Sequence, residues 1–223
     1  MKRLIIILFI VAGMAPDLQS VERDELYFKV GAGAGTSLLN NLADELELQG
    51  RELPFPEYSM MVSFGKSFAD NTIRAEAGFG FSLLPDIRYQ NEYEDFTEDM
   101  SHYDFSLLVR RVLIPERTLF SPSIGIGFGY GRTNLIEGAG RLDSFEILGS
   151  VQFDSHIRYN MDLFVEAFYI QGLSEKKFGA PFLESLNSDV LIGSDGEPIK
   201  DSYGYAGLRI GVTVWLELME ERY

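Results

Sequence analysis

The sequence predicts an all-β chain in which eight antiparallel strands run up and down around a barrel. Three observations support this fold class. Apolar and polar residues alternate with a period of two, the alternating segments number eight, and the connections between them are long and short in turn. Because successive side chains of a strand point to opposite faces, a period of two indicates a strand with one apolar face.

The alternation is clearest in residues 72–84, TIRAEAGFGFSLL, and in residues 206–218, AGLRIGVTVWLEL. The same criterion, applied along the whole chain, predicts strands at about 26–36, 57–68, 72–84, 101–113, 119–132, 144–159, 162–172 and 202–218. The seventh segment is the least regular, because the aromatic residues Phe164 and Phe168 share their parity with Glu166.

The connections place all long loops at one end of the barrel and all tight turns at the other. Long connections are predicted at 37–56, 85–100, 133–143 and 173–201, and short ones near residues 70–71, 115–116 and 160–161. The first long loop contains LLNNLADELELQG, which predicts a short amphipathic helix ended by Gly50 that either caps the barrel mouth or meets a partner. SDGE, at residues 194–197, predicts a tight turn.

The fifth strand carries a row of glycines, in the stretch SPSIGIGFGYGRT of residues 121–133. Glycine occupies every second position from Gly125 to Gly131, with Ile126, Phe128 and Tyr130 between. A phosphate-binding loop needs the spacing G-x-G-x-x-G followed by a helix, and neither is present in the sequence pattern. The stretch therefore predicts a strand with one apolar face and one bare face.

The polar faces of the strands are predicted to point into the barrel. They carry charges together with rows of glycine, which would weaken a strand on an outer surface for no gain. Inside a narrow eight-stranded barrel, glycine instead makes room for long charged side chains from neighbouring strands. The predicted interior charges are Lys29, Arg74, Arg110, Arg158, Arg209, Glu76, Asp104, Glu146, Asp154 and Glu166.

Aromatic residues form two belts on the apolar faces, as expected where a barrel crosses the two interfaces of a bilayer. The belt near the long loops contains Tyr58, Phe79, Phe81, Tyr103, Phe105, Phe128, Tyr130, Phe145 and Tyr169. The belt near the short turns contains Phe28, Phe64, Phe68, Phe120, Phe153 and Tyr159. Lys66 and Arg111 break the apolar parity, but both lie near the short turns, where a long cation can reach the interface.

The N-terminus predicts export. Lys2 and Arg3 precede an apolar run too short to span a bilayer as a helix, so residues 1–20 are predicted as a signal peptide and 21–223 as one barrel domain. The chain has no cysteine, which excludes disulfides, a thiol nucleophile and thiolate metal sites. A formal net charge of -15 argues against nucleic acid as a partner.

The signal peptide, the eight strands and the loop rhythm resemble the small OmpA/OmpX-type outer-membrane barrels of bacteria. The last strand also resembles the assembly signal of that family, through Arg209, Gly211, Val214 and Leu216, although MEERY then follows. The resemblance implies an outer-membrane location in a diderm bacterium. It also implies contact with membrane lipid and lipopolysaccharide, recognition of the C-terminal strand by the assembly machinery, and a monomer.

Two readings of the charged interior remain open at this point. The balance of charges predicts an ion-pair network that plugs the barrel, and the alternative is a narrow channel for ions or small polar solutes.

Some barrels of this type modify lipid A, and His102 lies near Asp104 and Ser106 on one strand face. Residues two apart on a strand are separated by about 7 Å, so this row is not a catalytic triad.

The long loops are acidic, notably at 37–56 and 85–100. Clustered carboxylates either bind divalent cations or form a solvated surface, and no spaced calcium-binding motif is present. We therefore expect no catalytic residue, no cofactor and no metal site. The expected role is that of a non-enzymatic barrel that makes structural or surface contacts through acidic loops. The alternatives are the narrow channel, a lipid A acyl-modifying enzyme using His102, and a secreted lipocalin-like binder.

Overall fold

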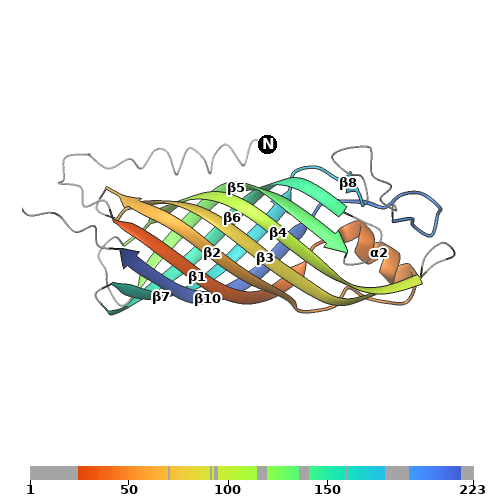
Figure 1. Cartoon of the computed structure of the whole chain (residues 1–223), viewed down its shortest axis with the longest axis horizontal. Helices are drawn as coiled ribbons and strands as arrows, with labels where there is room; N and C mark the ends of the chain where they lie inside the picture. Colours follow the sequence, from red (N-terminus) through yellow and green to blue (C-terminus); the bar gives the residue numbers. More distant parts are fainter. Residues whose placement is uncertain are drawn as a thin grey trace, which may run out of the picture.

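The computed structural model describes residues 25–69, 71–90, 92, 95–114, 120–135, 141–158, 160–178 and 191–216. Eight long strands form a closed barrel in the order β1-β10-β7-β6-β5-β4-β3-β2, with every neighbouring pair antiparallel (Figure 1). The strands are β1 (Leu26–Ser37), β2 (Glu57–Phe68), β3 (Ile73–Gln90), β4 (Asp95–Val112), β5 (Ser121–Leu135), β6 (Arg141–Arg158), β7 (Met161–Gly172) and β10 (Gly204–Leu216). The predicted fold class is confirmed, and the predicted signal peptide lies outside the described residues.

The two ends of the barrel differ in structure. At the turn end, where β2 passes to β3 and β6 to β7, the connections are short, and the start of β1 lies beside the end of β10 (Figure 1). At the loop end lie helix α2 (Asn40–Leu48) and a two-stranded sheet of β8 (Lys176–Lys177) and β9 (Lys200–Asp201). The two longest connections, from β1 to β2 and from β7 to β10, lie at this end, as predicted.

The predicted loop at 85–100 is wrong, because β3 and β4 continue through most of it. A β-bulge between Leu84 and Ile87 shifts the register, so that Ile87 and Tyr89 join the buried face of the strand. Asp86 occupies the bulge with φ +57. The shift breaks the simple period of two, which is why the alternation in the sequence ends near Leu84.

The predicted loop at 133–143 is also shorter than expected. β5 runs on to Leu135 and β6 starts at Arg141, so the two strands pair beyond the predicted bounds. Arg132 of β5 contacts Asp143 of β6 at 2.9 Å, which links the two strands near the loop end, and Arg141 of β6 contacts the same carboxylate at 2.8 Å. The barrel wall therefore projects beyond its apolar belt at the loop end.

The structure that covers the barrel mouth at the loop end, which we call the cap, has a hydrophobic core of its own. The helix predicted in the first loop is α2; Leu39 before it, and Leu42 and Leu46 within it, are buried, and Gly50 follows it with φ +70. These leucines pack in one cluster with Leu84, Ile87, Tyr89, Met100, Leu142, Phe168, Ile170, Phe178, Leu191, Ile199, Tyr203 and Tyr205. The helix covers the barrel mouth, and the turn predicted at 194–197 is present, closed by a hydrogen bond from Gly196 N to Gly193 O of 3.0 Å.

The barrel wall is apolar outside and polar inside. Phe128 and Ile210 are more than 60% exposed, at 64% and 61%, whereas the side chains of Lys29 and Arg110 are almost completely buried, at 0% and 1%. A soluble lipocalin-like barrel has the opposite arrangement, with its apolar face inside. The chain is therefore a transmembrane β-barrel. Among the described residues, no helix has the length and hydropathy needed to cross a membrane.

Glycines allow β1 and β10 to approach closely where the barrel closes. Gly31 lies opposite Gly211, and Gly35 lies opposite Gly207. The ring of Phe164 fills the space that side chains at Gly31 and Gly211 would occupy; a Cβ atom on Gly31 would lie 2.8 Å from Phe164 Cζ. The aromatic residues of β7 that share the parity of Glu166 therefore point inward, which explains the irregular pattern of that strand.

Candidate functional site

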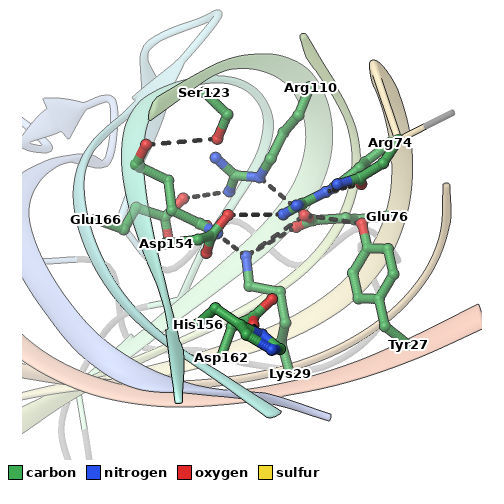
Figure 2. Close-up of polar contacts among 12 residues, drawn as sticks. Tyr27, Lys29, Arg74, Glu76, Arg110, Ser123, Asp154, His156, Asp162 and Glu166 are labelled. Atoms are coloured by element: carbon green, nitrogen blue, oxygen red, sulfur yellow. Dashed lines mark hydrogen bonds and ion pairs between the residues drawn. The ribbon is translucent and has the colours of Figure 1, made fainter. Parts of the chain in front are cut away.

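The barrel interior between β1, β3, β4, β6 and β7 contains a connected network of charged side chains (Figure 2). All of the predicted interior charges lie inside except Arg158, which is exposed. A register irregularity between His156 and Arg158 turns the end of β6 outward, and this corrects the prediction for Arg158. The remaining predicted charges are brought together from strands that are far apart in the sequence.

Arg110 of β4 is the centre of the network. Its Nε donates to Glu76 Oε1 at 2.8 Å, its Nη2 donates to Glu166 Oε1, and its Nη1 donates to Ser150 Oγ at 2.9 Å. A planar guanidinium presents its donors in a rigid fork, so one side chain can hold partners on three different strands. Arg110 thereby links β3, β6 and β7 across the interior.

Lys29 and Arg74 extend the network toward the turn end. Lys29 Nζ lies 3.2 Å from Glu76 Oε2 and donates to Gln152 Oε1 at 2.7 Å. Gln152 in turn donates to Asp154 Oδ1 at 2.6 Å, and Arg74 Nη1 donates to Asp154 Oδ2 at 2.7 Å. Because Lys29 and Arg74 each have a charged partner and a further hydrogen bond, the cost of removing these two charges from water is offset.

Aromatic side chains close the network at the turn end. Tyr27 donates to Glu76 Oε1 at 3.0 Å, and its ring centroid lies 5.0 Å from that of Trp215. The guanidinium of Arg74 lies 5.0 Å from the Trp215 ring, and Trp215 Nε1 donates to Asp162 Oδ2 at 2.6 Å. These residues occupy the barrel section next to the short connections.

A second polar cluster lies at the loop end of the interior, directly below the cap. Tyr203 donates from its hydroxyl to Glu57 Oε1 at 2.6 Å, and Ser82 Oγ donates to the same oxygen. Burial, together with the neighbouring Glu57 carboxylate, raises the pKa of Tyr203 well above its ordinary value, which keeps the phenol protonated as a donor. His102 stacks on Tyr203 with ring centroids 3.6 Å apart.

The geometry around His102 gives no support for catalysis. His102 Nδ1 lies 3.0 Å from Thr133 Oγ1, and its Nε2 lies 3.4 Å from Glu146 Oε1. The side chain is 2% exposed and faces the interior, so it cannot meet a lipid outside the barrel wall. The ring nitrogens thus contact Thr133 of β5 and Glu146 of β6.

Little free space remains between the two clusters. A cavity of about 40 Å³ lies between Arg110, Asp104 and Arg209, and one of about 10 Å³ lies beside His102. A single water needs roughly 10–15 Å³ of such volume, so these cavities hold a few waters at most. Within the described part of the chain, bonded side chains occupy the interior around these two cavities. The described residues also contain no group of three or more His, Asp or Glu side chains placed to hold a metal ion.

Several interior residues were not predicted, although the sequence carried a signal for some of them. Glu57 has the same parity as Ser59 and Ser63, so extending the count to the first residue of its strand would have placed it inside. Tyr27 likewise shares the polar parity of its strand. Trp215 is buried on the polar face, where the alternation of residues 206–218 places it. Tyr203 precedes β10, and nothing in the sequence indicates that its hydroxyl meets Glu57.

Comparisons with known proteins agree with this architecture. No protein-family model matches the chain, and no curated protein matches it by sequence. Neisserial surface protein A has a similar solved structure, with 14% identity, coverage of 85% of this chain and 96% of its own, and a TM-score of 0.53. This likeness shows a common fold, that of the small eight-stranded outer-membrane barrels, as the resemblance to the OmpA/OmpX type predicted.

Two further structures have lower scores. Ail, the attachment invasion locus protein of Yersinia pestis, was solved with the heparin analogue sucrose octasulfate. It has 10% identity, coverage of 86% of this chain and 99% of its own, and a TM-score of 0.47. The N-terminal β-barrel domain of Pseudomonas aeruginosa OprF has 12% identity, coverage of 84% and 96%, and a TM-score of 0.41.

Proposed function

We propose that this protein is a non-enzymatic barrel of the outer membrane of a diderm bacterium, which presents the cap outside the cell as a surface for contact with other molecules. The observation that carries the proposal is the division of the molecule into a filled interior and an ordered cap. The interior is occupied by bonded side chains, so the folded wall and its network serve as a rigid support. The cap is then the part of the described chain that can meet molecules in solution.

The surface of the cap is acidic, which supports contact with cationic groups. Exposed carboxylates come from separate segments around the mouth: Asp44, Glu47, Glu52, Asp86, Glu92, Asp95, Glu175, Asp195 and Glu197. Exposed cations there are fewer, and include Arg88, Lys177 and Lys200. A surface with one predominant sign of charge attracts partners of the opposite sign at a distance, and salt weakens this attraction.

Location and orientation are tested first. Cells that produce the full chain are fractionated, and the protein is followed on SDS gels with and without heating. The proposal predicts recovery in the outer-membrane fraction, with faster migration of the unheated form. A protease added to intact cells should cut only segments of the loop end. Recovery in the soluble periplasm, or cleavage at the turn end, contradicts the proposal.

Surface contact is tested with charge-neutral variants of the cap. Replacing Asp44, Glu47, Asp195 and Glu197 with their amides should reduce retention of whole cells on a polycationic surface, with a larger effect at low salt. The control is Asp162→Asn, which removes a carboxylate inside the barrel and leaves the cap surface unchanged. Equal retention of all three cell types contradicts the role of the acidic cap.

A channel function is tested by conductance in planar bilayers. The plug predicts no steady open level for the purified barrel. A large and steady conductance from the folded protein would mean that the network opens, and the passive support role would then be wrong.

A further inference from the structure

A groove on the lipid-facing side of the barrel extends from β2 across β3 and β4 to β5. Its floor is formed by the small side chains of Ala75 and Ala77. The strand register places Phe64 and Leu107 on either side of Ala77. In the same way, Lys66 and Val109 flank Ala75. Two small residues in succession between larger neighbours therefore leave a trough in the wall.

The groove is large and almost wholly apolar. It has a volume of about 900 Å³, in the upper part of the range of roughly 300–1,000 Å³ in which proteins bind small molecules. Phe64 on β2 and Phe128 on β5, which are 61% and 64% exposed, form its raised edges. Toward the loop end, β3 continues with the bulky Phe79, so the trough is deepest on the half of the strand nearer the turn end.

Two cations lie where the groove reaches the turn end. Lys66 on β2 is opposite Ala75, and Arg111 on β4 is opposite Ile73, so both flank β3 on the lipid-facing side. Strands lie about 4.8 Å apart and residues two apart are separated by about 7 Å, which places the two Cα atoms roughly 12 Å apart. Both side chains are long enough to converge on one small group between them. Lys66 Nζ lies 5.1 Å from the centroid of the Phe68 ring and therefore extends toward the turn end.

We propose that this groove is a binding site for one anionic glycerophospholipid. One acyl chain lies over Ala75 and Ala77, between the side chains of β2 and β4. The phosphate and the negatively charged headgroup lie between Lys66 and Arg111. Both halves of the site match one amphiphile in the correct order, with the apolar trough toward the middle of the membrane and the cations toward its surface.

The same features argue against a second copy of the chain in the groove. Two copies in one membrane with the same orientation are related by an axis along the membrane normal. Their turn ends then lie at the same level, and the Lys66 and Arg111 pairs of the two copies would face each other. Like charges at an apolar contact oppose association, whereas a phosphate attracts both cations.

The test uses native mass spectrometry of the purified folded barrel in detergent, with phosphatidylglycerol or phosphatidylethanolamine of identical chains added. The wild-type protein should retain phosphatidylglycerol more tightly than phosphatidylethanolamine. The double variant Lys66→Gln, Arg111→Gln should lose about thirtyfold in affinity for phosphatidylglycerol, and with it the preference between the two lipids. The matched control Arg158→Gln removes a cation at the same end of the barrel on β6, away from the groove, and should bind as the wild type does.

A second variant tests the trough. Ala77→Leu fills the floor and should weaken both lipids equally while the preference for phosphatidylglycerol is kept. Folding of every variant is verified by heat-modifiable migration. The proposal is overturned if Arg158→Gln weakens binding as much as the double variant does, if Ala77→Leu leaves both affinities unchanged, or if the wild type binds a second chain in place of lipid. It is also overturned if folded wild type shows no preference between the two lipids.

Discussion

Replacing Arg110 with Met tests whether the interior network holds the barrel together. The change removes the guanidinium that donates to Glu76, Glu166 and Ser150. Glu76 keeps two partners, since Lys29 and Tyr27 remain at 3.2 and 3.0 Å. Glu166 keeps an ion pair with Arg209, but that contact is 3.9 Å long.

The expected loss of unfolding free energy is about 3–5 kcal/mol, which is typical when one member of a buried ion pair is removed and the other stays charged. Most of this loss should come from Glu166, because its carboxylate loses its closest partner. Adding Glu166→Gln to Arg110→Met should therefore recover a large part of the loss. Arg110→Lys retains the charge but not the fork of donors, and it should have an intermediate cost.

Unfolding by urea in lipid vesicles provides the measurement. The chain has one tryptophan, Trp215, whose side chain is buried in the interior, so its fluorescence reports the opening of the barrel. The control Arg158→Met removes an exposed arginine and should cost less than about 1 kcal/mol. The reasoning is refuted if Arg110→Met costs no more than this control, or if Glu166→Gln restores none of the loss.

Four further outcomes are expected. Gly127→Leu should destabilise the barrel by about 1–3 kcal/mol in the same assay, because a Cβ atom there meets the backbone of β4, whereas Ile126→Val should change stability by less than about 0.5 kcal/mol. Asp201→Ala should destabilise α2 by about 1 kcal/mol, because Asp201 Oδ2 accepts a hydrogen bond from Leu42 N at 3.0 Å. Hydrogen exchange of the α2 amides measures this loss. Asp201→Asn keeps an acceptor and is the control. Burial raises the pKa of Asp201 above its ordinary value of about 3.8, so the native cap binds this proton more strongly than the unfolded chain does. The stability of the cap should therefore fall as the pH rises through the pKa of Asp201. A rise in stability over that range would contradict the raised pKa of Asp201. His102→Ala should leave the acyl chains of lipid A unchanged in mass spectra of extracts from producing cells, and altered acylation contradicts the non-enzymatic role.

The strands and their inner and outer faces could be predicted from the sequence because parity is a local property. Each alternating segment places its own side chains on one face or the other without reference to the rest of the chain. The prediction fails where a bulge changes the parity. The bulge near Asp86 interrupts the alternation, so the last third of β3 was not predicted, and the bulge near Ile157 turns Arg158 outward.

The partners within the interior could not be predicted in the same way. Lys29 meets Gln152 across 123 residues of sequence, and Tyr203 meets Glu57 across 146. Parity gives the face of a residue but neither its height along the barrel nor the strand opposite to it. Those depend on the stagger of all eight strands, which is set only when the barrel closes.

The cap and the barrel wall depend on different physical forces, and this gives them different responses to temperature. The cap buries leucines and aromatic rings away from water, so its unfolding carries a large positive heat capacity and its stability curve is strongly bent. The network in the wall is held by charges and hydrogen bonds, while the outer face of the wall stays in lipid. Cooling should therefore weaken the cap more than the wall, so that a cold outer membrane would hold an intact barrel with a loosened mouth.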